Sequence, residues 1–599
     1  MMLKKIAIPL IIVILIIITT FPLVFKVNSC MPAFFSTDES FGVLWSAWLT
    51  KFNIVNHLPF VKTDFIAYPY GVELYSTLVG YIWFAINFIL AMLTNPVLVY
   101  NIQVLLNIFL TALITYLLVF YLTRNKFAAL CSGIAYGFCP YIFVRSWQHL
   151  GETYLWPIPL FLWFMLRLKN EKSLRIKALF VLAFILSTIN FDVTYYLLVI
   201  FGAYLVYLLL KPRDNFRYIR RLVILMIISF LILIPQLFPI ILNVFFKAQT
   251  VPSAQNTFFR PFEDLFAQSA RPLSYLLPSI AHPIFGKFTQ FFVGTPLYGM
   301  SFTEHTLYLG WVPIILSIVA FRKLKRKRPV SGVRCHVSDE DRFNIRFFVL
   351  LAVVAWLWSQ PPWWQVGPIR ILMPSFFMYK LLPMIRAYCR FGAVVMLAVS
   401  VLAGFGLKFI LEKYKIRKAK ITVAALFYLL ILFEFWSYPP FKVLDVSRIP
   451  AVYYWVKEQP PKTVIAEYPL DLKGPNELRK LYQTKHEKRM INATIPGTFA
   501  HKRSEAITEL SVKHTAGVLK WMGVDYVLVH KNKYLDTGLL KDVEELDRIP
   551  SNPGLRLIGS FPGQKCPSSV IPCIAESGPI DIYEVIAEPI QATLEKRQN

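Results

Sequence analysis

Long apolar runs recur along this chain, and they constrain its fold more than any other feature. An α-helix of roughly 20 apolar residues is long enough to cross the ~30 Å of hydrocarbon in a bilayer. The mean hydropathy is +0.52, and only 16% of the residues are charged. The sequence therefore predicts a polytopic α-helical membrane protein of about 11 spans. The apolar segments run roughly over 6–25, 97–122, 127–144, 152–168, 178–190, 194–210, 222–245, 306–321, 346–360, 391–412 and 421–438.

Basic residues outnumber acidic residues, with 63 Lys and Arg against 35 Asp and Glu and a formal net charge of +28. They gather at the ends of the apolar runs, and RKLKRKR at 322–328 is the densest group. Lys and Arg in short connectors mark the cytoplasmic side of a membrane protein. We therefore interpret the positive charge as an orientation signal, and we expect membrane lipids and no nucleic acid as partners.

The apolar segment 77–94 decides the predicted topology. If it crosses the membrane, the basic connectors at 124–126 and 167–177 fall outside the cytoplasm. If it lies along the interface or re-enters, every basic connector falls inside. We predict the second arrangement, with an uncleaved first span and an N-in, C-out topology. The membrane domain then covers 1–438, with outer loops at 29–96, 246–305 and 361–390.

The tail at 439–599 differs in composition from the rest of the chain. TVIAEYP at 463–469, DYVLVH at 525–530 and DIYEVI at 581–586 have the length and β-branched content of strands. Residues 503–522 are predicted to be helical. We expect an α/β domain, which the predicted topology places outside the cytoplasm. Cys566 and Cys573 are close enough for a disulfide in an oxidising compartment, and two free thiols fit the sequence equally well.

The stretch FSTDESF at 35–41 places two acids, Asp38 and Glu39, where the chain first leaves the membrane. A carboxylate there can act as a general base toward an acceptor hydroxyl, and a neighbouring acid can raise its pKa. A helix cap is the alternative, because Ser36, Thr37 and Asp38 precede the apolar run FGVLWSAWL. The two interpretations are compatible, since one carboxylate can cap while the other reacts.

Two further segments hold candidate binding residues. In SWQHLGE at 146–152, one helical turn would place His149 and Glu152 on the same face, and an interfacial anchor is the alternative. Arg386 and Arg390 lie in a predicted outer loop, against the positive-inside trend. A phosphate or pyrophosphate would explain them, because Arg binds such groups with two hydrogen bonds. Anionic lipid headgroups or ion pairs to the tail are the alternatives.

The chain resembles the integral-membrane glycosyltransferases of the GT-C superfamily, in a little-characterised bacterial and archaeal branch. The resemblance rests on a first span followed by STDES, on IAYPYGVELYS, IAYGFCPYIFVRSWQHLGE, RPLSYLLPSIAHPIFG and MIRAYCRFGAVVMLAVSVLAGFGL, and on YQTKHEKRMINAT and LKWMGVDYVLVHKN in the tail. It implies a hexosyl- or pentosyltransferase of the plasma membrane, with its active face outside. The donor would be a polyprenyl-phosphate-linked sugar, and the acceptor a glycan, a lipid or a protein.

The resemblance also implies residue roles. The first-loop acid is the expected base, and this role carries over to Asp38 with Glu39 as its neighbour. Tyr70 and the 77–94 helix are expected to wall the site. Binding of phosphate by Arg386 or Arg390 is our inference from charge. The first loop contains no DxD motif, so no metal ligand is predicted and no cofactor is certain, although the sequence leaves a divalent cation open.

Two other classes of function remain open at this point. A lipid-linked saccharide translocase or transporter would carry ionisable groups in the middle of its spans. Few are present, since Asp192 sits at a predicted hairpin turn and Glu434 near a membrane exit. A non-catalytic membrane assembly protein would tolerate any replacement of Asp38.

Overall fold

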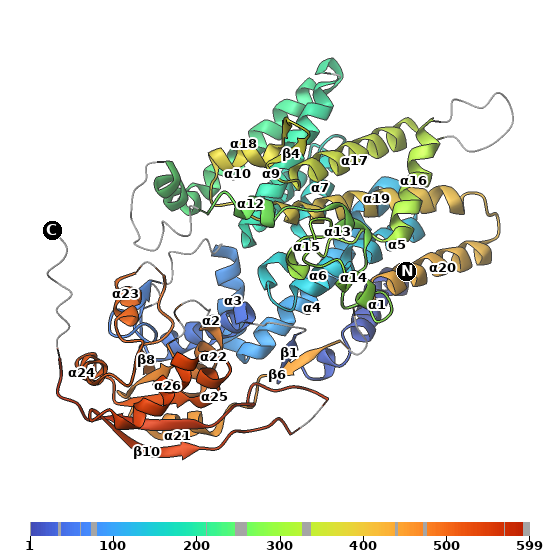
Figure 1. Cartoon of the computed structure of the whole chain (residues 1–599). Helices are drawn as coiled ribbons and strands as arrows, with labels where there is room; N and C mark the ends of the chain where they lie inside the picture. Colours follow the sequence, from blue (N-terminus) through green and yellow to red (C-terminus); the bar gives the residue numbers. More distant parts are fainter. Residues whose placement is uncertain are drawn as a thin grey trace, which may run out of the picture.

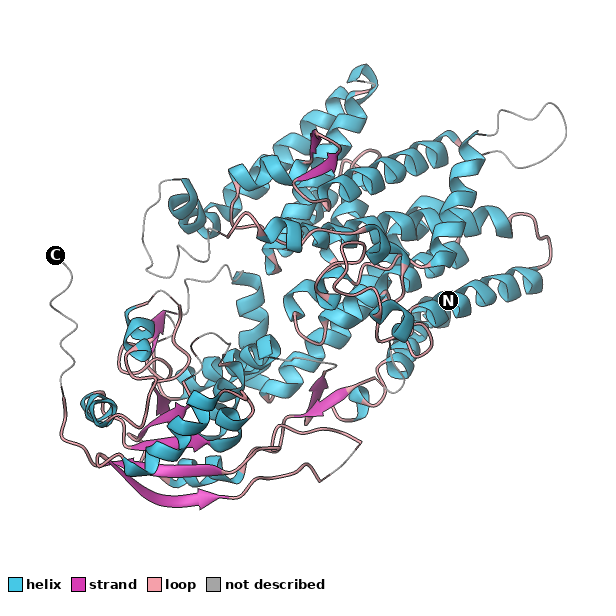
Figure 2. Ribbon diagram, in the orientation of Figure 1, coloured by secondary structure: helices cyan, strands magenta, loops and turns pink. Residues whose placement is uncertain are grey.

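The computed structural model describes residues 2–33, 38–59, 62–73, 81–210, 212–245, 260–325, 337–437, 441–470, 472, 476–496, 498–567 and 570–590. The chain forms a large helical part and a smaller lobe that contains a β-sheet (Figures 1 and 2). The lobe is made by the last quarter of the sequence, coloured orange to red in Figure 1. The backbone of Asp38 is described, but its side chain lies outside the described part, as do residues 34–37.

The helical part consists of long apolar helices joined by loops with short helices. Apart from the loop before α16, its helices are α1 (Met2–Thr19), α2 (Asp38–Val55), α3 (Tyr81–Leu93), α4 (Pro96–Thr123), α5 (Lys126–Gly137), the short α6 (Pro140–Arg145), α7 (Pro157–Arg167), α8 (Leu174–Leu186), α9 (Phe191–Leu209), α10 (Pro212–Phe245), α16 (Trp311–Lys325), α17 (Asp339–Trp358), the short α18 (Pro374–Leu381), α19 (Gly392–Leu411) and α20 (Arg417–Glu434). The loop before α16 holds α12 (Asp264–Ala267), α13 (Pro272–Leu276), α14 (Gly286–Gln290) and α15 (Phe302–His305).

Five helical segments are long and apolar enough to cross a membrane, counted over the residues that the structure describes. They are Pro96–Thr123, Lys126–Arg145, Phe191–Leu209, Asn215–Phe238 and Tyr388–Leu411, and each overlaps a predicted span. The second and the last form the centre of the bundle, because 94% and 89% of their apolar windows are buried. The total of about 11 spans and the orientation stay predictions.

Small residues allow the central helices to pack closely. A Cβ atom at Gly406 of α19 would lie 1.9 Å from the carbonyl oxygen of Leu316 in α16. A Cβ atom at Gly137 of α5 would lie 2.5 Å from the Cβ of Ala112 in α4. Close approach of backbones through small residues is how helices pack within a membrane, where lipid tails compete with side chains for apolar contacts.

Helix α3 covers most of the segment that decides the predicted topology. It has 13 residues, which corresponds to about 20 Å at 1.5 Å per residue and is shorter than the hydrocarbon layer. Its length agrees with a helix that does not cross the membrane, and the interfacial or re-entrant placement of 77–94 stays a prediction.

The tail contains a five-stranded sheet in the order β10-β11-β9-β7-β8. The strands are β7 (Val464–Tyr468), β8 (Arg489–Met490), β9 (Tyr526–His530), β10 (Leu555–Phe561) and β11 (Ile580–Val585). Strands β8, β7 and β9 are parallel, whereas β9, β11 and β10 are antiparallel. The three strands predicted from sequence are therefore β7, β9 and β11.

The tail helices are α21 (Ala451–Glu458), α22 (Glu477–His486), α23 (Phe499–Glu505), α24 (Lys513–Trp521), α25 (Lys531–Leu535) and α26 (Leu540–Arg548). The single helix predicted for 503–522 is wrong, because a turn separates α23 from α24. Side chains bind the backbone of this turn. The Asn552 amide donates to the carbonyls of Leu510 and Val512, and the Ser511 backbone N–H donates to Glu545. These contacts replace the hydrogen bonds of a continuous helix.

The tail is tied to the first loop of the chain. Strand β1 (Cys30–Pro32) pairs with β6 (Val443–Asp445) in an antiparallel ladder, at the junction of the two parts in Figure 1. Trp45 of α2 donates from Nε1 to Oε1 of Gln483 in α22, at 2.7 Å. The tail therefore braces α2, the helix that begins with the acidic pair.

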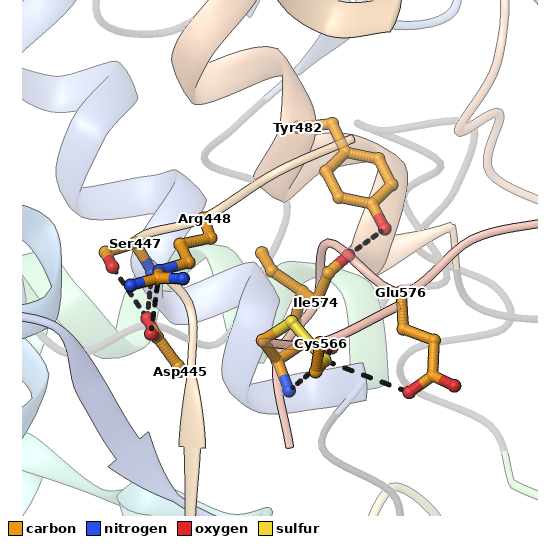
Figure 3. The surroundings of a disulfide bond; sticks show 8 residues. Asp445, Ser447, Arg448, Tyr482, Cys566, Ile574 and Glu576 are labelled. Carbon is orange, nitrogen blue, oxygen red and sulfur yellow. Dashed lines mark hydrogen bonds and ion pairs between the residues drawn. A yellow bond between two sulfur atoms is a disulfide. The ribbon is translucent and has the colours of Figure 1, made fainter. Parts of the chain in front are cut away.

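Cys566 and Cys573 form a disulfide, so the alternative of two free thiols is wrong. The loop that it closes packs on β6, because the backbones of Asp445 and Ile574 are hydrogen-bonded. In Figure 3 the hydroxyl of Tyr482 points at the carbonyl of Ile574, to which it donates at 2.9 Å. The disulfide loop is thereby held between β6 and α22.

Candidate functional site

The first turn of α2 packs on the segment 146–149, which brings the two acidic motifs together. Ser40 is fully buried, and its hydroxyl donates to the carbonyl of Trp147 at 3.1 Å. The hydroxyl of Tyr100 in α4 lies 3.0 Å from Ser40 Oγ and donates to the carbonyl of Ser146 at 2.8 Å. These contacts place Glu39, the residue before Ser40, next to His149.

Glu39 and His149 form a short ion pair, with 2.5 Å between Oε2 and Nδ1. An ionised carboxylate only accepts, so the Nδ1–H of the imidazole donates. The Glu39 side chain is 57% exposed, whereas that of His149 is 14% exposed. Burial alone would raise the pKa of Glu39, but the hydrogen bond and charge of His149 outweigh it and lower that pKa. Glu39 is thus held ionised at the outer edge of the site.

Arg390 lies at the centre of the site, and each of its guanidinium nitrogens is bonded to a carboxylate. Its Nη1 is 2.8 Å from Glu152 and 2.7 Å from Asp192. Its Nη2 and Nε bind the two oxygens of Glu304, at 2.7 and 3.1 Å. This fork-shaped contact uses the planar geometry that distinguishes Arg from Lys.

Glu304 links Arg390 to the other basic side chains. Arg145 donates to Glu304 Oε2 at 2.9 Å, and both side chains are buried. His149 Nε2 lies 3.7 Å from Glu304 Oε1. Burial would raise the pKa of Glu304, but Arg145 and Arg390 hold it well below the usual range. A chain of contacts therefore runs from Arg390 through Glu304 and His149 to the exposed Glu39.

We call these seven residues the Arg390 cluster: Glu39, Arg145, His149, Glu152, Asp192, Glu304 and Arg390. Four carboxylates face two guanidinium groups and one imidazole, so the acids are in excess. The cluster lies at helix ends, because Arg145 closes one candidate span while Asp192 and Arg390 stand in the first turns of two others. Buried charges at such a position mark functional sites in membrane proteins.

The structure brings together four of the residues singled out from sequence, namely Glu39, His149, Glu152 and Arg390. Arg386 is not among the contacts of the cluster. It pairs with Asp264 at 3.3 Å, and its side chain is 42% exposed. Tyr70 packs against Phe499 of the tail, with 5.0 Å between ring centroids.

Sequence reasoning missed three members of the cluster. No spacing singles out Glu304 in the predicted outer loop 246–305, and Asp192 is predicted only as a turn residue. Arg145 was not considered. The one available signal was their position, because each borders an apolar run on the predicted outer face, where a charge needs a partner. Within the described ranges, no group of three or more His, Cys, Asp and Glu side chains is placed to hold a metal ion.

The tail holds a second buried charged group, which the sequence did not reveal. Glu467 of β7 is fully buried, and its Oε2 lies 2.8 Å from both His530 Nε2 and the Tyr453 hydroxyl. Arg479 Nε lies 3.6 Å from the same oxygen. Burial opposes ionisation of Glu467. The hydrogen bond and charge of His530 have the largest opposing effect, and with Arg479 and Tyr453 they lower the pKa of Glu467 to about 2. We call these four residues the Glu467 cluster; Glu467, Arg479 and His530 line a cavity of 530 Å³.

The comparisons with known proteins support the fold. No protein-family model matches the sequence, and no curated protein matches it. The structure is similar to the cryo-EM structure of the arabinofuranosyltransferase AftD from Mycobacteria, with a TM-score of 0.55 and 12% identity over 98% of this chain. An AftD mutant, R1389S, gives a TM-score of 0.50 with 12% identity over 97% of this chain.

This chain spans about 40% of the length of the AftD chains. The oligosaccharyltransferase of Archaeoglobus fulgidus gives a TM-score of 0.47 with 12% identity, over 96% of this chain and 88% of that one. The expected resemblance to the GT-C superfamily is confirmed at the level of the fold. The molecule is a multi-pass helical membrane protein that shares the fold of the arabinofuranosyltransferase AftD.

Proposed function

We propose that this protein is a membrane glycosyltransferase. It moves a sugar from a polyprenyl-phosphate donor to an acceptor outside the cytoplasm, which is a glycan, a lipid or a protein. One observation carries the proposal: Glu39 in the acidic turn at the start of α2 pairs with His149, which faces Glu304 and, through it, Arg390 at the end of a candidate span. The fold shared with AftD supports it. We place the site and the tail on the outer face of the plasma membrane.

The proposed transfer is a single displacement. Asp38 accepts the proton of the acceptor hydroxyl as that oxygen attacks the anomeric carbon of the donor sugar. The bond from that carbon to the phosphate oxygen breaks, and its electron pair leaves with the phosphate. The configuration at the anomeric carbon is therefore inverted. Glu39, held by His149, keeps the first turn of α2 in place beside the acceptor.

Arg390 has a positioning role in this proposal. Each of its guanidinium nitrogens is already bonded to a carboxylate, and the excess of acids around it would repel a phosphate. Its contacts hold Glu304, which in turn faces His149. The first-loop acids thus depend on Arg390 through two intermediate side chains.

We assign the departing phosphate to Arg386 together with Arg260. Burial and the nearby charge of Arg386 lower the pKa of Arg260, and Asp264 is the acid that these two guanidinium groups share. Paired guanidinium groups bind a phosphate through charge-assisted hydrogen bonds. Arg386 is also close to the Arg390 cluster. It is four positions from Arg390 in the chain, and four extended residues span at most about 14 Å between Cα atoms.

The test is replacement of the acidic pair in cells. We expect Asp38→Asn to abolish a cell-surface glycan and Glu39→Gln to reduce it, while the amount of protein in the membrane stays normal. Asp64→Asn is the matched control, because Asp64 is also a first-loop acid but pairs with Arg489 of the tail. An unchanged glycan profile in both site variants would overturn the proposal.

A further inference from the structure

We propose that the groove between α8 and α10 is a binding site for an anionic phospholipid. The groove is a cavity of 730 Å³ with apolar walls and a basic end. The basic side chains are Lys177, Arg217, Arg220 and Arg221. This site is separate from the Arg390 cluster and does not rest on the proposed function.

The apolar walls of the groove face outward from the bundle. Leu182 is 47% exposed, Ile224 is 49% exposed and Ile228 is 40% exposed. The last two lie in the candidate span Asn215–Phe238, of which only 28% is buried. This part of α10 is therefore in contact with lipid tails, and a concave apolar wall at this depth accommodates an acyl chain.

The basic end supplies a receptor for a negatively charged headgroup. None of the described residues that line the groove is acidic. Arg221 donates from Nη1 to the carbonyl of Leu168 at the end of α7, at 2.7 Å, and this bond fixes its guanidinium. Arg217 lies about one helical turn before Arg221, and Arg220 is its neighbour in sequence. Both are exposed. A phosphate diester beside these groups gains charge-assisted hydrogen bonds, whereas the ammonium of a zwitterionic lipid is repelled.

The groove is far from the site proposed for transfer. Lys177 lies in the first turn of α8, and Asn190, just beyond the last turn, donates to the carbonyl of Gly151 beside the Arg390 cluster. Helix α8 has 13 residues, so its two ends are about 20 Å apart at 1.5 Å per residue. A lipid phosphate at Lys177 thus binds at the opposite end of the bundle, which the positive-inside rule assigns to the cytoplasm.

The test is native mass spectrometry of the full-length protein in detergent, with added dioleoyl-phosphatidylglycerol or dioleoyl-phosphatidylethanolamine. We expect one tightly bound phosphatidylglycerol that phosphatidylethanolamine does not replace. The triple variant Lys177→Gln, Arg217→Gln, Arg220→Gln should weaken this binding at least tenfold and leaves Arg221 with its bond to Leu168. Ile228→Trp fills the groove without a change of charge, and it should weaken binding similarly.

The matched control removes three exposed charges elsewhere, by Lys413→Gln and Lys415→Gln in the connector between α19 and α20 and Lys418→Gln in the first turn of α20. It should leave phosphatidylglycerol binding unchanged. Equal binding of the two lipids, or equal loss in the control and the triple variant, would show non-specific annular lipid and overturn the proposal.

Discussion

The Arg390 cluster of the helical part and the Glu467 cluster of the tail both combine carboxylates with Arg and His side chains. Carboxylates are in the majority in the first and in the minority in the second. In the first, four carboxylates share two arginines and a histidine, and the Glu39 carboxylate is exposed. In the second, one fully buried carboxylate is held by His530, Arg479 and Tyr453. A buried carboxylate that serves only the fold needs partners that satisfy it, because an unpaired buried charge is costly.

The difference teaches which group is the better candidate for chemistry. The surplus of acids in the Arg390 cluster is not needed to pair its cations, and it extends to the surface through His149 and Glu39. The Glu467 cluster joins β7 and β9 at neighbouring positions of the sheet, through Glu467 and His530. We therefore interpret the first as a functional site and the second as a brace, and three predictions test this comparison.

The largest expected effect comes from Arg390→Ala. Three carboxylates would lose their common cation, and breaking a buried pair costs about 3–5 kcal/mol. The variant should unfold at a lower temperature in detergent and accumulate poorly in the membrane. Arg386→Ala is the control and should change stability by less than about 1 kcal/mol, because its pair with Asp264 is half exposed. Equal stability of the two variants would contradict the central position of Arg390.

Removal of one carboxylate from each cluster should have unequal effects. Glu467→Gln leaves His530 and Arg479 without their common acid, and we expect a loss of about 3 kcal/mol in the stability of the tail. Glu152→Gln keeps the shape of the side chain, and Arg390 retains Asp192 and Glu304, so we expect about 1 kcal/mol. Hydrogen exchange of the surrounding peptides measures both. A larger loss for Glu152→Gln would reverse the comparison.

The smallest effect concerns the pH dependence of the tail. His486 is fully buried beside the Glu467 cluster, and its Nδ1 accepts the backbone N–H of Lys488. Burial lowers its pKa to about 4 from 6.5. A lowered histidine pKa means that the neutral form stabilises the fold above about pH 6.5, and that this contribution is lost as the pH falls toward 4. We expect the tail to lose about 1.5 kcal/mol between pH 6.5 and pH 5.

Hydrogen exchange of tail peptides at these two pH values measures this change. His486→Asn retains an acceptor but does not titrate, so it should abolish the part of the pH dependence that His486 contributes. His514→Gln, at an exposed position of α24, should leave it unchanged. Full pH dependence in His486→Asn would show that another group is responsible.

The features of the fold that sequence predicted are local ones. Apolar length predicted the five candidate spans, and β-branched runs predicted β7, β9 and β11. The helix start at Asp38 follows from its neighbours, and α2 begins there. The prediction of one helix at 503–522 failed because Asn552 binds the backbone of the intervening turn, and nothing near 510 in the sequence announces a partner some 40 residues away.

In the candidate site too, the sequence predicted local features and the tertiary structure supplied the long-range contacts. Taken alone, the sequence identified Glu39, His149, Glu152 and Arg390 as charged residues at the mouths of apolar segments, where charge is expensive. It also determined that such charges need partners. Only the tertiary structure decided which partners they have, because Glu304 reaches Arg145 and Arg390 across 159 and 86 positions of chain. Pairing over such separations has no local pattern, since it depends on how the helices pack.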